Sequence, residues 1–397
     1  MTKKYSFDQA INRRNTGCIK YDFAPARDNE DIIPLWVADM DFPVLPEVQE
    51  ALMETVRQGI YGYSFPQEDY FKAVQGWMQR RHDWTIQKDW IVPIAGIVPA
   101  LKQCVQAFTE PGDEVLVFKP VYHPFDDAVL GNQRVLVCCP LDFEEETGHY
   151  SIDFERLERL LEAHDVKMMI FCSPHNPVGR IWTEEELQKL ADLAEKYNIL
   201  IISDEIHMDL QHTRKHIPFL KAAPQLKDNM VVCTAPSKTF NLAGLSTSNL
   251  VIPSEARRKR LREIQARNGS ETPNLFGLRA CQAAYEHGDQ WVDELNEYIE
   301  GNEAFVKDWL AEHLPEVQAI PMEGTYLMWL DFRKIEPDPD KLEQLMLEEA
   351  GVWLDEGYIF GEQGNGFERV NLACCRSLLQ KALEKIEKAV RNRSDNN

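Results

Sequence analysis

The chain has 397 residues, 44% of them hydrophobic, and carries 43 Lys and Arg against 65 Asp and Glu. This composition excludes a disordered or fibrous protein. The net charge of −22 argues against nonspecific binding to nucleic acid or to anionic membranes, because such binding relies on clustered Lys and Arg. No stretch reaches the roughly 18 consecutive apolar residues of a membrane span, so we expect a soluble, cytoplasmic protein without a membrane partner.

The cysteines and one run of basic residues have simple structural explanations. The nine cysteines include no Cys-x-x-Cys spacing, and we expect them to be reduced residues of the core. The basic run at residues 257–260 is short, which is typical of a solvated helix face. Neither feature predicts a binding site.

Apolar periodicity predicts a helix and then a series of strands. Residues 46–59 are amphipathic with a period of 3.6 and end at Gly59, which predicts a helix that stops there. From about residue 91, short apolar runs alternate with helical segments. These runs predict strands at residues 115–118, 135–138, 168–172, 199–202, 231–233 and 250–252. Because the runs lack polar alternation, we expect a mainly parallel sheet covered by helices on both faces.

The helical segments divide the chain into three parts. Residues 99–108 predict a helix, and Thr183 with Glu186 predicts a capping box that opens a helix running to about Tyr197. After residue 285 the pattern changes to charged helices at 289–313 and 378–392 around a strand-like run at 325–330. We therefore expect an α/β fold with an N-terminal segment (1–45) that packs on the small domain, a large domain (46–287) and a small α+β C-terminal domain (288–397).

Chemically distinctive side chains follow several of the predicted strands. Ligands of open α/β sheets bind beyond the carboxyl ends of the strands. The residues found there are Tyr122, Asn176, Asp204, His207 and Lys238. An amine for a Schiff base, a carboxylate for a pyridine nitrogen and an aromatic ring for stacking suit pyridoxal phosphate. Taken singly, an Asp after a strand is usually a helix cap and a Lys is usually a surface charge.

Backbone groups near residue 96 are candidates for binding the phosphate. Gly96 and Ile97 precede the predicted helix at 99–108. The N-terminus of a helix presents free N–H groups and a positive dipole end to an anion.

Three motifs resemble those of one enzyme family. They are Asp204-Glu-Ile-His207-Met-Asp209-Leu210, residues 235–245 around Lys238, and residues 34–42 with the sequence PLWVADMDF. Over nearly the whole chain, the sequence resembles the cystathionine β-lyase type of carbon–sulfur lyase, within the aspartate aminotransferase superfamily of fold-type I pyridoxal phosphate enzymes. The resemblance implies a mostly parallel sheet flanked by helices, with a smaller C-terminal α+β domain.

The resemblance also implies roles for individual residues. It implies Lys238 as the Schiff-base lysine, Asp204 as the partner of the pyridine nitrogen and Tyr122 as the stacking ring. The other implied cofactor contacts are Asn176 to the ring oxygen, His207, and a phosphate cradle of Gly96, Ile97, Thr234 and Ser237. Arg369 is the implied clamp on the substrate α-carboxylate, and Trp36, Asn176 and Tyr326 are candidate walls of the substrate pocket. The resemblance further implies a homodimer in which Tyr63 reaches the phosphate of the neighbouring subunit.

Two departures separate this chain from ordinary aminotransferases. Ser246 stands eight residues after Lys238, where aminotransferases place an Arg that neutralises the phosphate, and His207 stands where they commonly have Tyr. Both departures favour the lyase branch and leave open how the phosphate charge is balanced.

The predicted activity is α,β-elimination from a small sulfur-containing amino acid. The substrate would be cystathionine, cysteine or another S-substituted cysteine, and the products a thiol or sulfide, pyruvate and ammonia. One alternative is an aminotransferase of class I/II, and another is a catalytically vestigial regulatory or binding protein. Retention of Lys238, Asp204, Asn176, Tyr122 and Arg369 argues against the second alternative.

Three further patterns have structural explanations. Aromatic residues beside apolar runs, such as Trp36, Tyr326 and Trp329, are more often core than pocket. The spacing of His207, His212 and His216 does not place them on one helical face, so we expect no metal site. Glycines 361, 364 and 366 lack a strand–glycine–helix frame and predict a turn.

Overall fold

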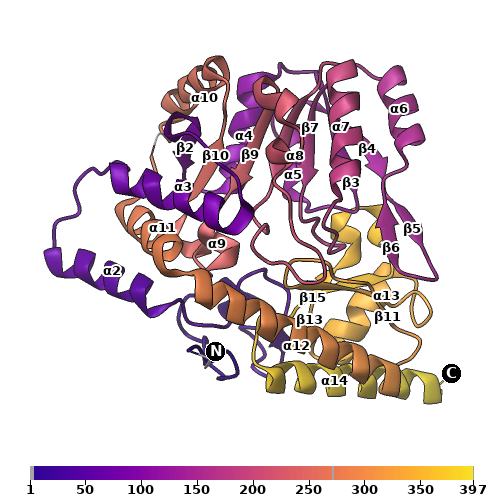
Figure 1. The fold of residues 1–397 in the computed structure, drawn as a ribbon. Coiled ribbons are helices and arrows are strands. Elements are labelled where there is room, and N and C mark those ends of the chain that lie inside the picture. Colours follow the sequence, from indigo (N-terminus) through magenta and orange to yellow (C-terminus); the bar gives the residue numbers. More distant parts are fainter. Residues whose placement is uncertain (1–3, 271, 397) are drawn as a thin grey trace.

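The computed structural model describes residues 4–270 and 272–396. A seven-stranded sheet with the order β2-β10-β9-β8-β7-β3-β4 forms its centre (Figure 1). The strands are β2 (Ile91–Ile94), β3 (Glu114–Lys119), β4 (Val135–Pro140), β7 (Val166–Cys172), β8 (Leu200–Asp204), β9 (Met230–Thr234) and β10 (Ser248–Val251). Pairing from β9 through β4 is parallel, and β10 pairs antiparallel with both β9 and β2. The α/β class and the mainly parallel sheet are thus confirmed, whereas β2 was not predicted.

The two faces of the sheet belong to separate cores. Alternate side chains of β3 divide between them: Leu116 and Phe118 face one core, and Val115 and Val117 face the other. This division follows from the two-residue period of a strand. The prediction that every strand is covered on both faces is wrong for β4, which exposes Val135 and Cys138 because it is an edge strand.

Helices cover both faces (Figure 1). One core contains side chains of α4 (Ile97–Phe108), α5 (Pro124–Leu130) and α10 (Glu255–Asn268). The other contains side chains of α3 (Glu68–His82), α6 (Phe154–Ala163), α7 (Glu184–Lys196) and α11 (Leu275–His287). The capping box of α7 is confirmed, with Thr183 and Glu186 each bonding the other's backbone N–H.

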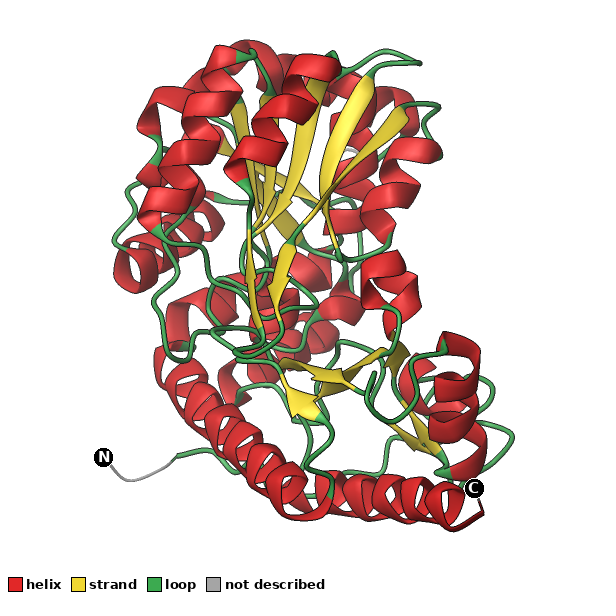
Figure 2. Cartoon of the chain, turned by 90° about the vertical axis from the view of Figure 1, so that its right-hand side faces the viewer, coloured by secondary structure: helices red, strands yellow, loops and turns green. Residues whose placement is uncertain are grey.

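A smaller sheet lies in the C-terminal part of the chain (Figure 2). Its order is β11-β12-β15-β14, from β11 (Gln318–Ala319), β12 (Leu327–Asp331), β15 (Phe367–Asn371) and β14 (Asp355–Glu356). The helices α12 (Asp289–His313), α13 (Pro339–Glu343) and α14 (Arg376–Asn396) accompany it. The bounds of α12 are those predicted, and α14 is longer than predicted at both ends. Glycines 361, 364 and 366 lie in the connection between β14 and β15.

The N-terminal segment crosses between the two parts. It contains α1 (Ile19–Asp22) and β1 (Ile33–Pro34), and β1 pairs parallel with β13 (Val352–Trp353). The helix α2 (Pro46–Gln58) follows and ends at Gly59, whose φ of 68° is the left-handed conformation that favours glycine. Residues 1–3, 271 and 397, which the predicted domains include, lie outside the described residues.

Two minor expectations needed correction. All nine cysteines are free, as expected, but Cys18 is only partly buried and Cys138 is exposed. Arg258, in the basic run at 257–260, is buried and donates to the carbonyls of Ile252 and Pro253, so that run is not uniformly a solvated face. Among the described residues, no helix has the length and apolarity needed to cross a membrane.

Candidate active site

A pocket of about 290 Å³ lies at the carboxyl ends of the central strands. It brings together eight of the predicted site residues: Gly96, Ile97, Tyr122, Asn176, Asp204, His207, Ser237 and Lys238. Since these residues lie at or just after the ends of different strands, their convergence depends on the sheet topology.

The start of a helix and three hydroxyl-bearing residues also line the pocket. The helix α4 begins at Ile97, two residues earlier than predicted, and Gly96 precedes it with a φ of 101°. No side chain caps this helix end and its first turn has no acidic residue. Ser246, Thr247 and Ser248 also line the pocket. Uncapped N–H groups and hydroxyls at a helix N-terminus suit a phosphate.

Lys238 approaches the pocket from the short helix α9 (Pro236–Thr239), which follows β9. Its Nζ donates a hydrogen bond of 2.7 Å to the carbonyl oxygen of Ala38. Burial, reinforced by the positive charge of Arg369, lowers the pKa of Lys238 to about 8. The amine is therefore substantially neutral near pH 8 and can act as a nucleophile or base.

Asp204 is the last residue of β8 and is almost fully buried. Desolvation raises the pKa of Asp204 to about 7, although the backbone N–H of Ile206 donates to its Oδ1 at 3.3 Å. A carboxylate held in such a site would be stabilised by a cationic partner.

His207 is buried beside Lys238 and is neutral. Burial, together with the charges of Lys238 and Arg369, places the pKa of His207 well below its ordinary value. Its Nδ1 is buried and has no hydrogen-bond partner among the described residues. An unpaired buried nitrogen of this kind is costly unless a ligand satisfies it.

Arg369 borders the pocket through Asn176. Its Nη1 donates to Asn176 Oδ1 at 3.0 Å, and its Nη2 donates to the carbonyl of Trp36 at 2.9 Å and to the carboxylate of Asp355. The ring of Trp36 stacks on Trp353 with centroids 4.1 Å apart. Arg369 and Trp36 therefore lie next to the pocket but outside its lining.

Three other predicted residues also lie outside the lining. Tyr63 is fully exposed in the loop after α2. Thr234 is buried in β9, where its hydroxyl donates to the carbonyl of Asn249 at 3.3 Å. Tyr326 is buried, and its hydroxyl donates to the carbonyl of Ala38 at 2.9 Å, so it is one contact away from Lys238.

Four residues in or next to the pocket were not predicted from the sequence. Ala38, Cys172 and Ile206 line the pocket, and Asp355 holds Arg369. For Ala38 and Ile206 a signal was available, since both lie inside motifs that carry the family resemblance. For Asp355 and Cys172 no local pattern distinguished them from other strand residues.

The three histidines considered for a metal have separate partners. His207 faces the pocket, His212 contacts the Thr325 carbonyl and His216 contacts Glu205. Across the described ranges, no group of three His, Cys, Asp or Glu side chains is placed to hold a metal ion.

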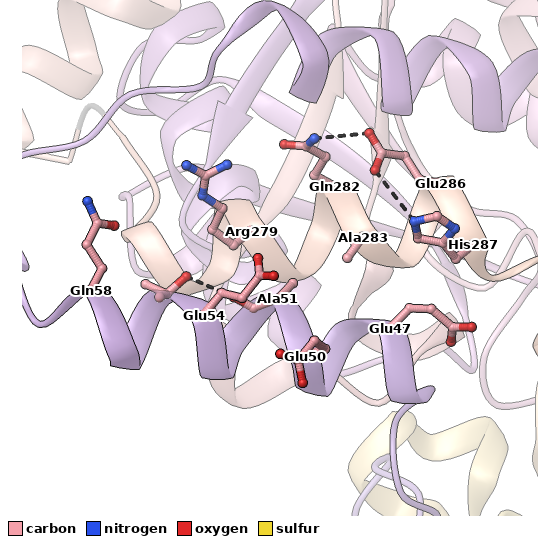
Figure 3. Close-up of a pocket in the computed structure, with 11 residues that line it drawn as sticks. Glu47, Glu50, Ala51, Glu54, Gln58, Arg279, Gln282, Ala283, Glu286 and His287 are labelled. Atoms are coloured by element: carbon pink, nitrogen blue, oxygen red, sulfur yellow. Dashed lines mark hydrogen bonds and ion pairs between the residues drawn. The ribbon is translucent and has the colours of Figure 1, made fainter.

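A larger pocket lies elsewhere, between α2 and α11 (Figure 3). Its volume is about 480 Å³. Glutamates 47, 50, 54 and 286 line it together with Arg279 and His287; the first three glutamates come from α2, and Glu286, Arg279 and His287 come from α11. None of the predicted catalytic residues is there, so its larger volume does not make it the active site.

Comparisons with known proteins agree with this geometry. Residues 30–386 match the family Aminotransferase class I and II. Cystathionine beta-lyase PatB of Bacillus subtilis (strain 168) is 41% identical over 97% of this chain and 100% of that protein. Cystalysin from Treponema denticola, solved with a pyridoxal 5'-phosphate cofactor, is 40% identical with a TM-score of 0.94, covering 98% and 99% of the two chains. The PLP-bound C-S lyase from Staphylococcus hominis is 33% identical with a TM-score of 0.90 and the same coverage.

Proposed function

The chain belongs to the aminotransferase class I and II family, and from this premise we propose that it is a pyridoxal phosphate-dependent carbon–sulfur β-lyase. Its substrate would be cystathionine, cysteine or another S-substituted cysteine. Elimination would release a thiol or sulfide. Hydrolysis of the remaining three-carbon amino acid fragment by one water molecule would then give pyruvate and ammonia. The convergence of Lys238, Asp204, Tyr122 and Asn176 on one pocket carries the proposal, and the 41% identity to a cystathionine β-lyase supports it.

The residues of the pocket fit the cofactor. Within the described part of the chain, Nδ1 of His207 has no hydrogen-bond partner and no side chain caps the start of α4. Lys238 would hold the cofactor covalently through Nζ, Asp204 would keep a proton on the pyridine nitrogen, and Tyr122 would stack on the ring. Asn176 would donate to the ring oxygen. Gly96, Ile97 and Ser237 would bind the phosphate, with Thr234 supporting them from β9.

Hydroxyls would balance the phosphate where aminotransferases use an Arg. Ser246, in the position of that Arg, lines the pocket together with Thr247 and Ser248. Several neutral donors and a helix N-terminus stabilise a phosphate dianion without a full counter-charge.

The bound cofactor supplies an electron-withdrawing ring that stabilises negative charge at the substrate α-carbon. Arg369 would grip the α-carboxylate, since a planar guanidinium can bind both of its oxygens. The amine of Lys238, released when substrate binds, would take the α-proton, and its pKa of about 8 matches that task near neutral pH. Trp36 and Tyr326 would bound the substrate on the side of the N-terminal segment.

We also propose that the protein is cytoplasmic and forms a homodimer. The loop after α2 exposes Ile60, Tyr61, Tyr63 and Phe65, an apolar group that a second copy would cover. In that arrangement Tyr63 would reach the phosphate of the neighbouring subunit. Nine free cysteines are in keeping with a reducing compartment.

The test is an end-point assay of purified holoenzyme with cystathionine and no 2-oxo acid, in which pyruvate and free thiol are measured together. Equal amounts of both products are expected. If neither forms, but addition of a 2-oxo acid yields a new amino acid, the protein is an aminotransferase. Absence of turnover with every amino acid, together with capture of a protein partner, would favour a vestigial enzyme.

A further inference from the structure

In this structure Arg369 already forms an ion pair with a carboxylate of the same chain. The strand register places Asp355 of β14 directly opposite Arg369 of β15, and the two side chains form an ion pair. Both residues are buried. The pair is therefore fixed by the pairing of two strands, in contrast to a surface ion pair that forms and breaks freely.

The guanidinium has little remaining capacity for a second anion. Nη1 is bonded to Asn176 and Nη2 to Trp36 and Asp355, while the buried Nε has no partner among the described residues. A substrate carboxylate bound at Arg369 would therefore share the single guanidinium charge with the Asp355 carboxylate. Two carboxylates that share a site repel, and one of them tends to be protonated.

We propose that Asp355 is a positioning residue that competes with the substrate carboxylate for Arg369, and that carboxylate binding there requires Asp355 to take up a proton from solvent. This inference rests on the proposed role of Arg369 as the carboxylate clamp. When the site is empty, Asp355 holds the guanidinium in place. When a carboxylate arrives, the protonated Asp355 leaves the positive charge of Arg369 to the ligand.

The surroundings of Asp355 allow this change of protonation. The titratable and charged groups around it are Arg369, His123 and Lys238 on the cationic side, and Tyr122, Glu356 and Glu368 on the acidic side. Burial raises the pKa of Asp355 above its ordinary value, even though Arg369, His123 and Lys238 favour the ionised form.

The test uses propionate, a carboxylate with no amine to react with the cofactor. Its Kd for the holoenzyme is measured by ligand-observed NMR between pH 6 and 9. For the wild type we expect Kd to rise toward about tenfold per pH unit, the dependence for uptake of one proton. Asp355→Asn should bind propionate at least about tenfold more tightly at pH 9, with little dependence on pH.

Two variants serve as matched controls. Asp355→Glu keeps the charge and should keep the pH dependence. Asp165→Asn removes an exposed carboxyl that precedes β7 at the end of the sheet opposite the pocket, so it should retain the wild-type Kd and slope. Thermal unfolding confirms that each variant is folded.

The outcomes separate this inference from the proposed function. If Asp355→Asn binds propionate with the wild-type slope, or more weakly than the wild type, Arg369 accommodates both anions and the inference is wrong. If Arg369→Gln binds propionate as tightly as the wild type, Arg369 is not the carboxylate clamp. That result overturns the proposed role of Arg369 and, with it, the inference.

Discussion

Lys238 and Tyr326 meet at one acceptor: the ε-amine and the phenol hydroxyl both donate to the carbonyl oxygen of Ala38, at 2.7 Å and 2.9 Å. Lys238 follows a strand of the central sheet, Tyr326 directly precedes β12 of the smaller sheet, and Ala38 belongs to the N-terminal segment. The three parts of the chain therefore converge at the amine that is proposed to do the chemistry.

The segment that carries Ala38 is held on both sides. Asn371 donates to the carbonyls of Val37 and Asp39, and a buried ion pair joins Asp41 to Lys20 at 3.0 Å. Because the backbone around Ala38 is fixed in this way, its carbonyl is a fixed acceptor for Lys238.

Replacing Tyr326 with Phe should change the titration of Lys238. Without the phenol, the Ala38 carbonyl accepts from the lysine alone, and a stronger hydrogen bond to the ammonium form raises the pKa of Lys238 above its present value of about 8. Since the neutral amine is the base, the acid limb of the kcat–pH profile should move upward by up to about one pH unit, the equivalent of one hydrogen bond. A profile that stays in place, or moves to lower pH, would contradict the shared-acceptor argument.

Lys238→Ala should abolish both turnover and the absorbance of the covalently held cofactor. The loss of a base that acts at the substrate α-carbon is expected to cost about 10²–10⁴-fold or more in kcat. The assay compares pyruvate formation and the visible spectrum with those of Lys227→Ala, an exposed lysine that should leave both unchanged. Elimination near the wild-type rate in Lys238→Ala would show that another group is the base.

Asp204→Asn should lower kcat far more than it raises KM. The amide cannot hold a proton on the pyridine nitrogen by charge, so stabilisation is lost mainly where negative charge develops, at a cost of about 10²–10³-fold. Asp165→Asn is the control, because Asp165 is exposed and precedes β7 at the end opposite the pocket. Unchanged turnover of Asp204→Asn would remove the electron-withdrawing argument.

Asp209 supports the helix that carries Lys238. The carboxylate accepts from Trp77 Nε1 at 3.1 Å and from Thr239 Oγ1 at 2.8 Å, and it contacts His82 Nε2 at 2.8 Å. Asp209→Asn places an amide N–H₂ among these donors in a buried site, and we expect the free energy of unfolding to fall by about 3 kcal/mol. Thr239→Val, which removes one hydrogen bond, should cost about 1 kcal/mol. Denaturant unfolding at pH 7 measures both, and equal losses would show that Asp209 serves Thr239 alone.

The features of this site that the sequence predicts are the local ones. Lys238, Asp204, Asn176 and Tyr122 were identified because each follows a strand whose apolar run is visible in the sequence, and the parallel topology then brings them together. Asp355 was missed because its contact with Arg369 depends on the register between β14 and β15, which no local pattern indicates.

Local sequence patterns also did not predict which backbone groups line the site or which strand residues are exposed to solvent. The Ala38 carbonyl is a group that any residue could supply, so the motif at residues 34–42 marked the segment but not this contact with Lys238. Similarly, the exposure of Cys138 follows from the position of β4 at the edge of the sheet, which is a property of strand order. Thr234 is the last residue of β9, one residue beyond the predicted strand, and its hydroxyl bonds within the sheet.

Glu368 and Glu356 should make the stability of the protein fall as pH rises. The register places them opposite each other on β15 and β14, Glu368 is buried and its Oε2 has no partner among the described residues. Burial and the neighbouring carboxylates raise the pKa of Glu368 well above its ordinary value and that of Glu356 to about 7. Because a raised carboxyl pKa means that the folded state binds more protons than the unfolded chain, the stabilising effect is complete below about pH 4 and is lost as pH rises through the raised values.

Glu368→Gln should therefore stabilise the protein at pH 8.5 and have little effect at pH 5. The amide can donate to the Glu356 carboxylate and removes a buried charge, a gain of about 1–3 kcal/mol. Thermal unfolding of the wild type and the variant at the two pH values measures the difference. A variant that is less stable than the wild type at pH 8.5 would show that the Glu368 carboxylate is stabilised by its neighbours, which would contradict this prediction.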